Sequence, residues 1–260
     1  MLEIEGVTKI FNRNSLDEKV ALREISLGIS GGEFVTIIGS NGAGKTTLLN
    51  AITGSVVIED GNIAIDGFDV THLPEFQRGK WIGRVFQNPL MGTASEMTIE
   101  ENLSMALLRG KTRGLRKGVT EGHRKVYRPI LETLGLGLEN RLKDRVGLLS
   151  GGQRQSLAIL MATLALPKLL LLDEHTASLD PKTAAVVLDL TERVVKDNRL
   201  TTLMVTHNMD QAIRYGNRLI MMHEARIVLD VSGKEKEKLT ISEVIQRFGI
   251  ADEGLLLVKQ

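Results

Sequence analysis

Two glycine-rich loops stand far apart in this chain, and each has the residues to bind phosphate. The first is Gly39-Ser40-Asn41-Gly42-Ala43-Gly44-Lys45-Thr46. Its glycines permit a tight turn whose backbone N–H groups converge on phosphate oxygens. Lys45 is placed to reach the β- and γ-phosphates, and the Thr46 hydroxyl is placed to bind Mg²⁺. The predicted nucleotide-binding residues are Gly39, Ser40, Asn41, Gly42, Ala43, Gly44, Lys45, Thr46 and Thr47.

The second loop is Leu149-Ser150-Gly151-Gly152-Gln153. Ser at the N-cap with Gln three residues later is a capping box, which by itself only starts a helix. Glycines in the first helical turn cost up to about 1 kcal/mol each relative to Ala, so a plain helix start does not need them. Bare N–H groups at a helix N-terminus would form a second anion site. Two such sites in one domain cannot easily face the same nucleotide. We therefore expect a head-to-tail dimer in which Ser150, Gly151, Gly152 and Gln153 bind the nucleotide of the other subunit.

Polar side chains follow several apolar runs that have the character of buried strands. Asp173 and Glu174 come directly after Leu169–Leu172, and ligands of open α/β sheets bind at the carboxyl ends of such strands. Gln87 follows Trp81–Phe86, and His207 follows Thr201–Thr206. Each has an ordinary alternative: solvated turn carboxylates for the acids, a surface position for the glutamine, and a helix cap for the histidine.

Together these motifs make the chain resemble the ATP-binding subunits of ABC transporters over about Leu2–Arg226. In that family LSGGQ is the signature motif, a dimer is the working form, and ATP and Mg²⁺ are bound. The resemblance implies that Thr46, Gln87 and Asp173 coordinate Mg²⁺. It also implies that Glu174 orients or deprotonates the attacking water, that Gln87 touches this water and relays to the membrane partner, and that His207 contacts the γ-phosphate.

The resemblance extends to three further places. Ser178, Leu179 and Asp180 correspond to a loop that lies across the dimer interface, although Asp180 is equally well suited to cap the following helix. Phe11, at the end of the first strand, corresponds to an aromatic residue that stacks on adenine, while an aromatic residue there is also a normal core residue. The chain departs from the family at His175, where many members have proline.

The elements that must position these residues predict an α/β fold. We expect a P-loop NTPase core with an antiparallel β subdomain and an inserted helical subdomain. The predicted segments are 1–86 for the β subdomain and first part of the core, 87–166 for the helical subdomain, 167–232 for the rest of the core, and 233–260 for a short tail. The predicted strands are Leu2–Phe11, Val20–Ile29, Phe34–Ile38, Gly61–Gly67, Trp81–Phe86, Leu169–Leu172, Thr201–Thr206, Arg218–His223 and Arg226–Val231. The predicted helices are Lys45–Thr53, Thr98–Arg109, Glu121–Gly135, Ser150–Ala165, Pro181–Lys196 and Thr240–Phe248.

Composition narrows the class of protein. The 260 residues carry a formal net charge of +1, so no overall positive field attracts nucleic acid, and we expect no nucleic-acid partner. There is no cysteine, which excludes disulfides and thiolate metal sites. No signal peptide and no apolar run of membrane-spanning length is present, so we expect a cytoplasmic protein that reaches a membrane only through a partner.

A separate ATPase chain with a short tail is similar to the importers of this family. That resemblance implies integral-membrane permease subunits, an extracytoplasmic solute-binding protein, and a peripheral position on the cytoplasmic face of the membrane. The run from Asp173 to Thr183 is similar to an amino-acid importer subgroup, sometimes linked to aromatic amino acids. The alternative is a soluble ATPase of the same type in cofactor assembly, repair or translation. The long coiled coil of the repair members and the second domain of the translation members are absent from this sequence.

Two other segments carry expectations. Asn88–Met97 combines apolar Leu90, Met91 and Met97 with loop-forming residues, and we expect it to dock a permease helix, unless Leu90 and Met97 fill the core instead. Arg109–Arg128 is basic, which indicates a solvated face or contact with anionic lipid. Its basic residues are Arg109, Lys111, Arg113, Arg116, Lys117, Arg124, Lys125 and Arg128.

Overall fold

The computed structural model describes residues 1–111, 114, 115, 117–247 and 249. Two compact units share them. The first is built from Met1–Arg78 and the chain from Leu200 onward, and the second is Gly79–Arg199. The division into segments 1–86, 87–166, 167–232 and 233–260 is a finer one and remains a prediction.

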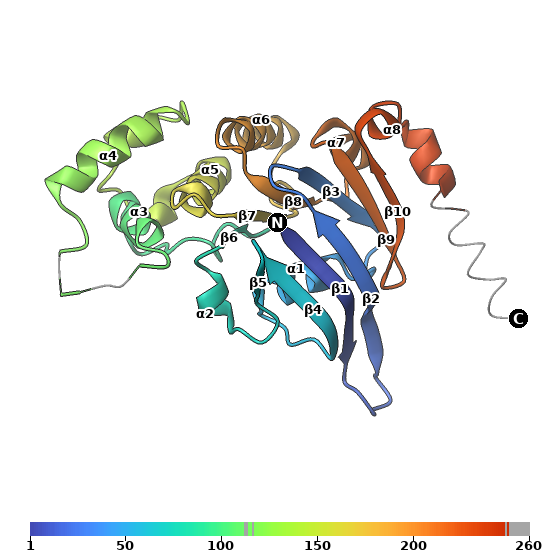
Figure 1. The fold of residues 1–260 in the computed structure, drawn as a ribbon. Helices are drawn as coiled ribbons and strands as arrows, with labels where there is room; N and C mark the ends of the chain where they lie inside the picture. The colour runs from blue at the N-terminus through green and yellow to red at the C-terminus, as the bar shows by residue number, and fades with distance from the viewer. Residues whose placement is uncertain (112–113, 116, 248, 250–260) are drawn as a thin grey trace, which may run out of the picture. The chain divides into compact units, whose positions relative to one another are not determined.

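An antiparallel sheet forms one part of the first unit (Figure 1). Its strands are β1 (Leu2–Phe11), β2 (Lys19–Ile29), β4 (Asp60–Ile65) and β5 (Phe68–Asp69), in the order β2-β1-β4-β5. Apolar side chains alternate along the strands and are buried, as at Leu2 and Ile4 of β1. The antiparallel β subdomain is therefore confirmed, with β5 as an addition that is too short for a sequence signal.

A second set of strands in this unit carries the first glycine loop. Parallel strand β3 (Phe34–Gly39) lies between β8 (Thr201–Val205) and β9 (Arg218–His223), and β9 forms the expected antiparallel hairpin with β10 (Arg226–Ser232). The loop leads from β3 into α1 (Lys45–Thr53), as predicted. The unit also contains α2 (Glu75–Arg78), α7 (Met209–Arg214) and α8 (Gly233–Glu237). Residues 241–247 are helical, and Phe248 of the predicted tail helix lies outside the described residues.

Arg78 fixes the far end of α1. Its guanidinium donates to the carbonyls of Ala51 and Ile52 at 2.8 and 3.0 Å, which are among the last carbonyls of the helix. A cation at this end also interacts favourably with the helix dipole. Gly54, which ends the helix with φ 79°, leaves room for this side chain, because a Cβ there would lie 2.6 Å from Arg78 Nε. The helix that follows the glycine loop is thus held at its C-terminal end.

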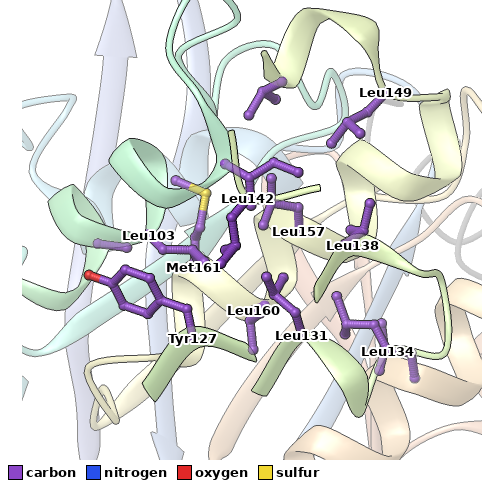
Figure 2. Close-up of a cluster of buried hydrophobic side chains, with 14 residues drawn as sticks. Leu103, Tyr127, Leu131, Leu134, Leu138, Leu142, Leu149, Leu157, Leu160 and Met161 are labelled. Atoms are coloured by element: carbon purple, nitrogen blue, oxygen red, sulfur yellow. The ribbon is translucent and has the colours of Figure 1, made fainter. Parts of the chain in front are cut away.

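The second unit is mostly helical around two parallel strands, β6 (Ile82–Val85) and β7 (Leu169–Asp173). Its helices are α3 (Ile99–Leu107), α4 (Glu121–Glu132), α5 (Gly151–Thr163) and α6 (Pro181–Asp197), with short 3-10 turns at Leu138–Asn140 and Val146–Leu148. Figure 2 shows their shared core, to which α3 contributes Leu103, α4 contributes Tyr127 and Leu131, and α5 contributes Leu157 and Leu160. These buried faces confirm the predicted helical insertion.

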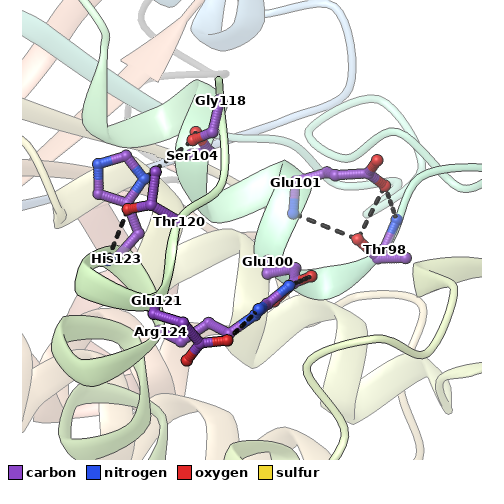
Figure 3. Close-up of polar contacts among 9 residues, drawn as sticks. All are labelled: Thr98, Glu100, Glu101, Ser104, Gly118, Thr120, Glu121, His123 and Arg124. Carbon is purple, nitrogen blue, oxygen red and sulfur yellow. Dashed lines mark hydrogen bonds and ion pairs between the residues drawn. The ribbon is translucent and has the colours of Figure 1, made fainter. Parts of the chain in front are cut away.

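The basic segment is not one solvated face, and that expectation was wrong for two of its arginines. Arg109 donates to the carbonyls of Met161 and Ala162 at 3.1 Å each and so caps the C-terminal end of α5. Burial lowers its pKa. Arg124 pairs with Glu100 through two bonds of 2.7 and 2.9 Å and also contacts Glu121 (Figure 3). Lys111, Lys117, Lys125 and Arg128 are exposed, while Arg113 and Arg116 lie outside the described residues.

Candidate functional site

The first glycine loop owes two of its glycines to close backbone contacts. Gly39 has φ 156°, and a Cβ there would lie 2.2 Å from the carbonyl oxygen of Met222. Gly44 has φ 100° at the N-cap of α1, and a Cβ there would lie 2.3 Å from the carbonyl oxygen of Ala21. No other residue type fits at either position, so neighbouring strands fix the path of the loop.

Lys45 folds its side chain back over this loop. The ammonium donates to the carbonyls of Gly39 and Ser40 at 2.9 and 3.0 Å, and the residue is only 6% exposed. Thr46 is exposed and Thr47 is half-buried in the first turn of α1. The N–H groups and the dipole at the N-terminus of α1 favour an anion. The first turn contains no acidic side chain that would repel a bound phosphate.

Two of the predicted residues lie near this loop within the first unit. In the parallel pairing of β3 and β8, Ile37 is level with Val205, and continuing this register places His207 level with Gly39. His207 is exposed and does not cap α7, because that cap is Asn208, whose side chain accepts from Gln211 N at 3.0 Å. The alternative of a capping histidine was therefore wrong.

Phe11 ends β1 opposite Lys19 on β2. Lys19 itself approaches the loop, since its Nζ lies 3.5 Å from the position of a Cβ on Gly42. The ammonium of Lys9 lies 5.1 Å from the centroid of the Phe11 ring, which is a cation–π contact. Phe11 at the end of β1 is thus paired with a residue, Lys19, whose side chain reaches the loop. Sequence reasoning missed Lys19, because its proximity depends on the pairing of β1 with β2.

The two acids of the second unit have different surroundings. Asp173, at the end of β7, is buried and accepts from Arg84 Nη2 at 2.9 Å through Oδ2. The same guanidinium lies 4.6 Å from the centroid of the Phe86 ring. Glu174 is less buried, and its backbone has φ 44°, in the left-handed region that side-chain-bearing residues rarely adopt. Such conformations cluster at functional sites, where the surrounding structure holds them.

Gln87 lies at the same edge of the β6–β7 pair. Val85 is level with Leu172, so continuing the register places Gln87 level with Glu174. The Gln87 side chain is exposed, and the main-chain carbonyl of Gln87 accepts from Ser178 Oγ at 3.4 Å. Sequence reasoning missed Gln155, a buried residue of α5 that donates to the carbonyl of Phe86 at 3.3 Å and ties α5 to this edge. The geometry therefore brings together Gln87, Ser178, Asp173 and Glu174 within one unit.

His175 is buried directly behind this edge. It is 2% exposed, and its Nε2 lies 3.2 Å from the hydroxyl of Thr191 on α6. Burial lowers the pKa of His175 to about 4, so the imidazole is neutral at neutral pH. The side chain is therefore a fixed hydrogen-bonding group rather than a charge.

The second glycine loop forms the capping box that its sequence predicts. Ser150 Oγ accepts from Gln153 N at 3.2 Å, and Gln153 Oε1 accepts from Ser150 N at 3.1 Å. Ser150 and Gly151 are exposed, and Gly152 is partly so. Gly152 has a packing role that the sequence did not suggest, because a Cβ there would lie 2.3 Å from Cγ2 of Thr183 on α6.

Asp180 caps α6, as the local sequence predicted. Its Oδ1 accepts from Thr183 N at 3.0 Å, and Asp180 itself is exposed. Pro181 occupies the first turn of the helix. Ser178 is exposed and Leu179 is half-buried beside the second glycine loop, where a Cβ on Gly151 would lie 3.3 Å from Leu179 Cδ2. The segment 178–180 is thus partly exposed at the surface, while its last residue is fixed as the cap of α6.

Segment 88–97 exposes two of its apolar residues and is held at its end by hydrogen bonds. Leu90 and Met91 are 47% and 69% exposed, so the alternative that Leu90 fills the helical core was wrong. Met97 is half-buried and lines a cavity of about 770 Å³, together with Met105 and Leu108. Buried Asn102 holds the end of the segment. Its amide donates to the carbonyls of Ala94, Met97 and Thr98 and its oxygen accepts from Ala94 N.

The predicted metal ligands are too few to hold a metal ion by protein groups alone. Among the residues that the structure describes, no group of three or more His, Asp or Glu residues could hold a metal ion. Thr46 in the first unit and Asp173 in the second each carry an oxygen, and Mg²⁺ typically takes one or two protein oxygens, with phosphate and water completing its shell. Over the same described residues, no helix is long and apolar enough to cross a bilayer.

Comparison with known proteins gives consistent matches. The model of the family described as "ABC transporter" matches residues 22–177. The "Tyrosine transport ATP-binding protein" of Clostridioides difficile (strain R20291) is 47% identical over 251 residues, which is 96% of this chain and all of that protein. The "Methionine import ATP-binding protein MetN" of Corynebacterium efficiens is 34% identical over 95% of this chain and 67% of its own length.

The fold is also similar to solved structures. The chain superposes with a TM-score of 0.76 on the structure described as "Dimeric structure of a post-hydrolysis state of the ATP-binding cassette MJ0796 bound to ADP and Pi". The two are 30% identical, and the match covers 89% of this chain and 98% of that one. A second cassette, MJ1267 in its ADP conformation, matches with a TM-score of 0.77 at 28% identity over 95% of this chain.

Proposed function

The chain belongs to the ABC transporter family of ATP-binding subunits, and from this premise we propose that it powers uptake of an amino acid, most specifically an aromatic one. It binds and hydrolyses ATP, as the family does. The proposal for the cargo is supported by the name of its tyrosine-transport relative, which matches over the full length of that protein. The other relative described above is named for methionine import, which also favours a transporter over an ATPase of repair, translation or cofactor assembly.

We assign each site residue a role in ATP binding and hydrolysis. The loop from Gly39 to Thr47 and the N-terminus of α1 bind the triphosphate. Lys45 exchanges its loop carbonyls for the β- and γ-phosphates. Glu174 takes the proton of the attacking water or holds that water in line, and His207 stabilises the charge on the γ-phosphate. Phe11 stacks on the adenine ring with the opposite face of its ring from Lys9.

Thr46 and Asp173, with Gln87, would hold Mg²⁺. When bound, the ion neutralises charge on the β- and γ-phosphates. Arg84 holds Oδ2 of Asp173 and so orients the carboxylate. Gln87 reports the state of the site to segment 88–97, which follows it directly in the chain.

Two subunits work together, with the second glycine loop of each acting on the nucleotide of the other. The exposed N-terminus of α5 at Ser150 and Gly151 supports this arrangement, and so does the exposed Ser178-Leu179-Asp180 segment beside it. A dimeric state is named for the similar cassette MJ0796. Leu90 and Met91 contact a helix of the permease, which places the subunit on the cytoplasmic face of the membrane. An extracytoplasmic solute-binding protein delivers the amino acid to that permease.

The single observation that carries the proposal is the presence of two glycine loops, each at the N-terminus of a helix, in one chain. A mixing experiment tests it. Lys45→Ala removes phosphate binding at the first loop, and Ser150→Arg blocks the second, so each variant alone should be inactive. A heterodimer of the two retains one intact composite site, and the mixture should regain ATPase activity. If the mixture stays inactive, crosslinking a cysteine at position 150 to the first loop of a second chain decides between a wrong geometry and obligatory coupling of the two sites.

The cargo is tested separately. Cells that lack this subunit should lose uptake of radiolabelled tyrosine and regain it on complementation with the wild-type chain but not with Lys45→Ala. Unchanged tyrosine uptake, with loss of uptake of another amino acid, would reassign the cargo and leave the ATPase role in place.

A further inference from the structure

His175 is a buried titratable side chain that the proposed hydrolysis does not use. It follows Glu174 directly, it is 2% exposed, and it reaches from the end of β7 to Thr191 on α6. The two residues are 16 positions apart, so the contact is not a local feature of the turn.

The direction of this hydrogen bond is fixed by a second one. The Thr191 hydroxyl lies 2.7 Å from the carbonyl oxygen of Val187, and that carbonyl can only accept. A hydroxyl has one proton, so Thr191 donates it to Val187 and must accept from His175. Nε2 of His175 therefore carries the imidazole proton, and the ring is held in a single tautomer and orientation.

The residue next to this anchor has an unusual backbone. Glu174 has φ 44°, and conformations of this kind persist only where surrounding contacts hold them. Its carbonyl accepts from Ala177 N at 2.9 Å, which closes a turn, and Leu179 N donates to the carbonyl of Thr176 at 3.2 Å to close the next. Among the side chains described for this turn, that of His175 joins it to α6 by a hydrogen bond.

We propose that His175 is a positioning residue for Glu174: its bond to Thr191 holds the backbone of Glu174 in the left-handed conformation and thereby aims the carboxylate at the water. The inference rests on the role proposed above for Glu174. The competing explanation is that the imidazole only fills space between β7 and α6.

Matched substitutions separate these explanations. Thr191→Val removes the acceptor with little change in volume, whereas Thr191→Ser keeps the hydroxyl. His175→Met removes the donor, whereas His175→Gln keeps an N–H at nearly the same place. ATPase activity of the full-length protein is measured well below every unfolding midpoint. Thr191→Val and His175→Met should each lower kcat about tenfold or more, with the KM for ATP unchanged. Thr191→Ser and His175→Gln should stay within about twofold of wild type.

A double-mutant cycle with Glu174→Gln gives the decisive readout. Glu174→Gln alone should abolish turnover while ATP binding remains. In that background Thr191→Val should have no further effect on the residual rate, because the anchor acts only through the lost carboxylate. If Thr191→Val and His175→Met keep wild-type kcat while lowering only the unfolding midpoint, the imidazole is a core residue and the positioning role is refuted. An additive effect in the Glu174→Gln background also refutes it. If Glu174→Gln itself retains near wild-type turnover, the role proposed for Glu174 fails first.

Discussion

Gly152 and Thr183 touch where α5 and α6 approach, so closely that a Cβ on Gly152 would lie 2.3 Å from Cγ2 of Thr183. Cβ atoms do not come so close to other carbons in real structures. One glycine of the second loop is therefore required by packing, whatever it contributes to nucleotide binding.

Gly152→Ala should lower the free energy of unfolding by about 1–3 kcal/mol, because the new methyl group overpacks the contact with α6. Thr183→Ser removes Cγ2, and the double variant should recover most of this loss. Gly151→Ala is the control, since its Cβ would lie 3.3 Å from Leu179 Cδ2 and needs only a small adjustment. Urea denaturation followed by circular dichroism measures the stability of these four variants and of wild type. Equal stability of Gly152→Ala and wild type would show that the two helices are not in this contact.

Arg109→Met should destabilise the helical unit by about 1–3 kcal/mol, since the carbonyls of Met161 and Ala162 at the end of α5 lose their buried partner. Lys125→Met on the exposed face of α4 provides the comparison and should change stability by less than about 0.5 kcal/mol. The urea midpoints of the two variants are compared with that of wild type. If both substitutions act alike, the arginine cap has no energetic role.

Leu90→Asp combined with Met91→Asp should abolish co-purification with the permease while nucleotide affinity stays unchanged. These side chains are exposed and outside the helical core, so the substitutions place charge on a surface without opening a cavity. Phe76→Asp on α2 is a matched control, because Phe76 is an exposed apolar residue of the other unit. Retention of the complex by the double variant, or its loss on Phe76→Asp, would place the docking surface elsewhere.

Acid should destabilise the protein partly through His175. Its pKa is lowered to about 4 in the folded state from a reference of 6.5, so the unfolded chain binds the proton first as pH falls. Stability contributed by the neutral ring is complete above pH 6.5 and is lost from there down to about pH 4. Relative to His175→Gln, wild type should lose about 2 kcal/mol of unfolding free energy between pH 7 and pH 5. An unchanged difference over this range would mean that the ring takes up its proton at the same pH in the folded and the unfolded chain.

The longer helices and strands were predictable because the residues that define them, such as caps, prolines and periodic apolar side chains, are close together in the sequence. Helix α1 was predicted with both ends correct, and α6 with an error of one residue, since a cap, a proline and an apolar face mark its course. Short helices such as α7 have too few residues for periodicity to emerge. In the candidate site, the motif residues were found at the expected strand ends.

The parts that could not be predicted depend on contacts between distant residues. Nothing near Arg109 in the sequence shows that it caps α5, because its acceptors lie more than fifty positions away. The bond from His175 to Thr191 likewise joins residues 16 positions apart and arises only when β7 and α6 pack together. Local sequence indicates which side chains can do chemistry, but the packing of the elements sets their orientation.

The four hydrogen bonds of Asn102 bear on how quickly a partner can associate with segment 88–97. A loop that must be ordered on contact loses conformational entropy at that moment, and many encounters fail. Here the hydrogen bonds of the buried Asn102 side chain already hold the backbone at the end of the segment in one conformation. A partner therefore binds a segment whose end needs no further ordering. Its association rate is then set by diffusion and by the orientation of the two surfaces.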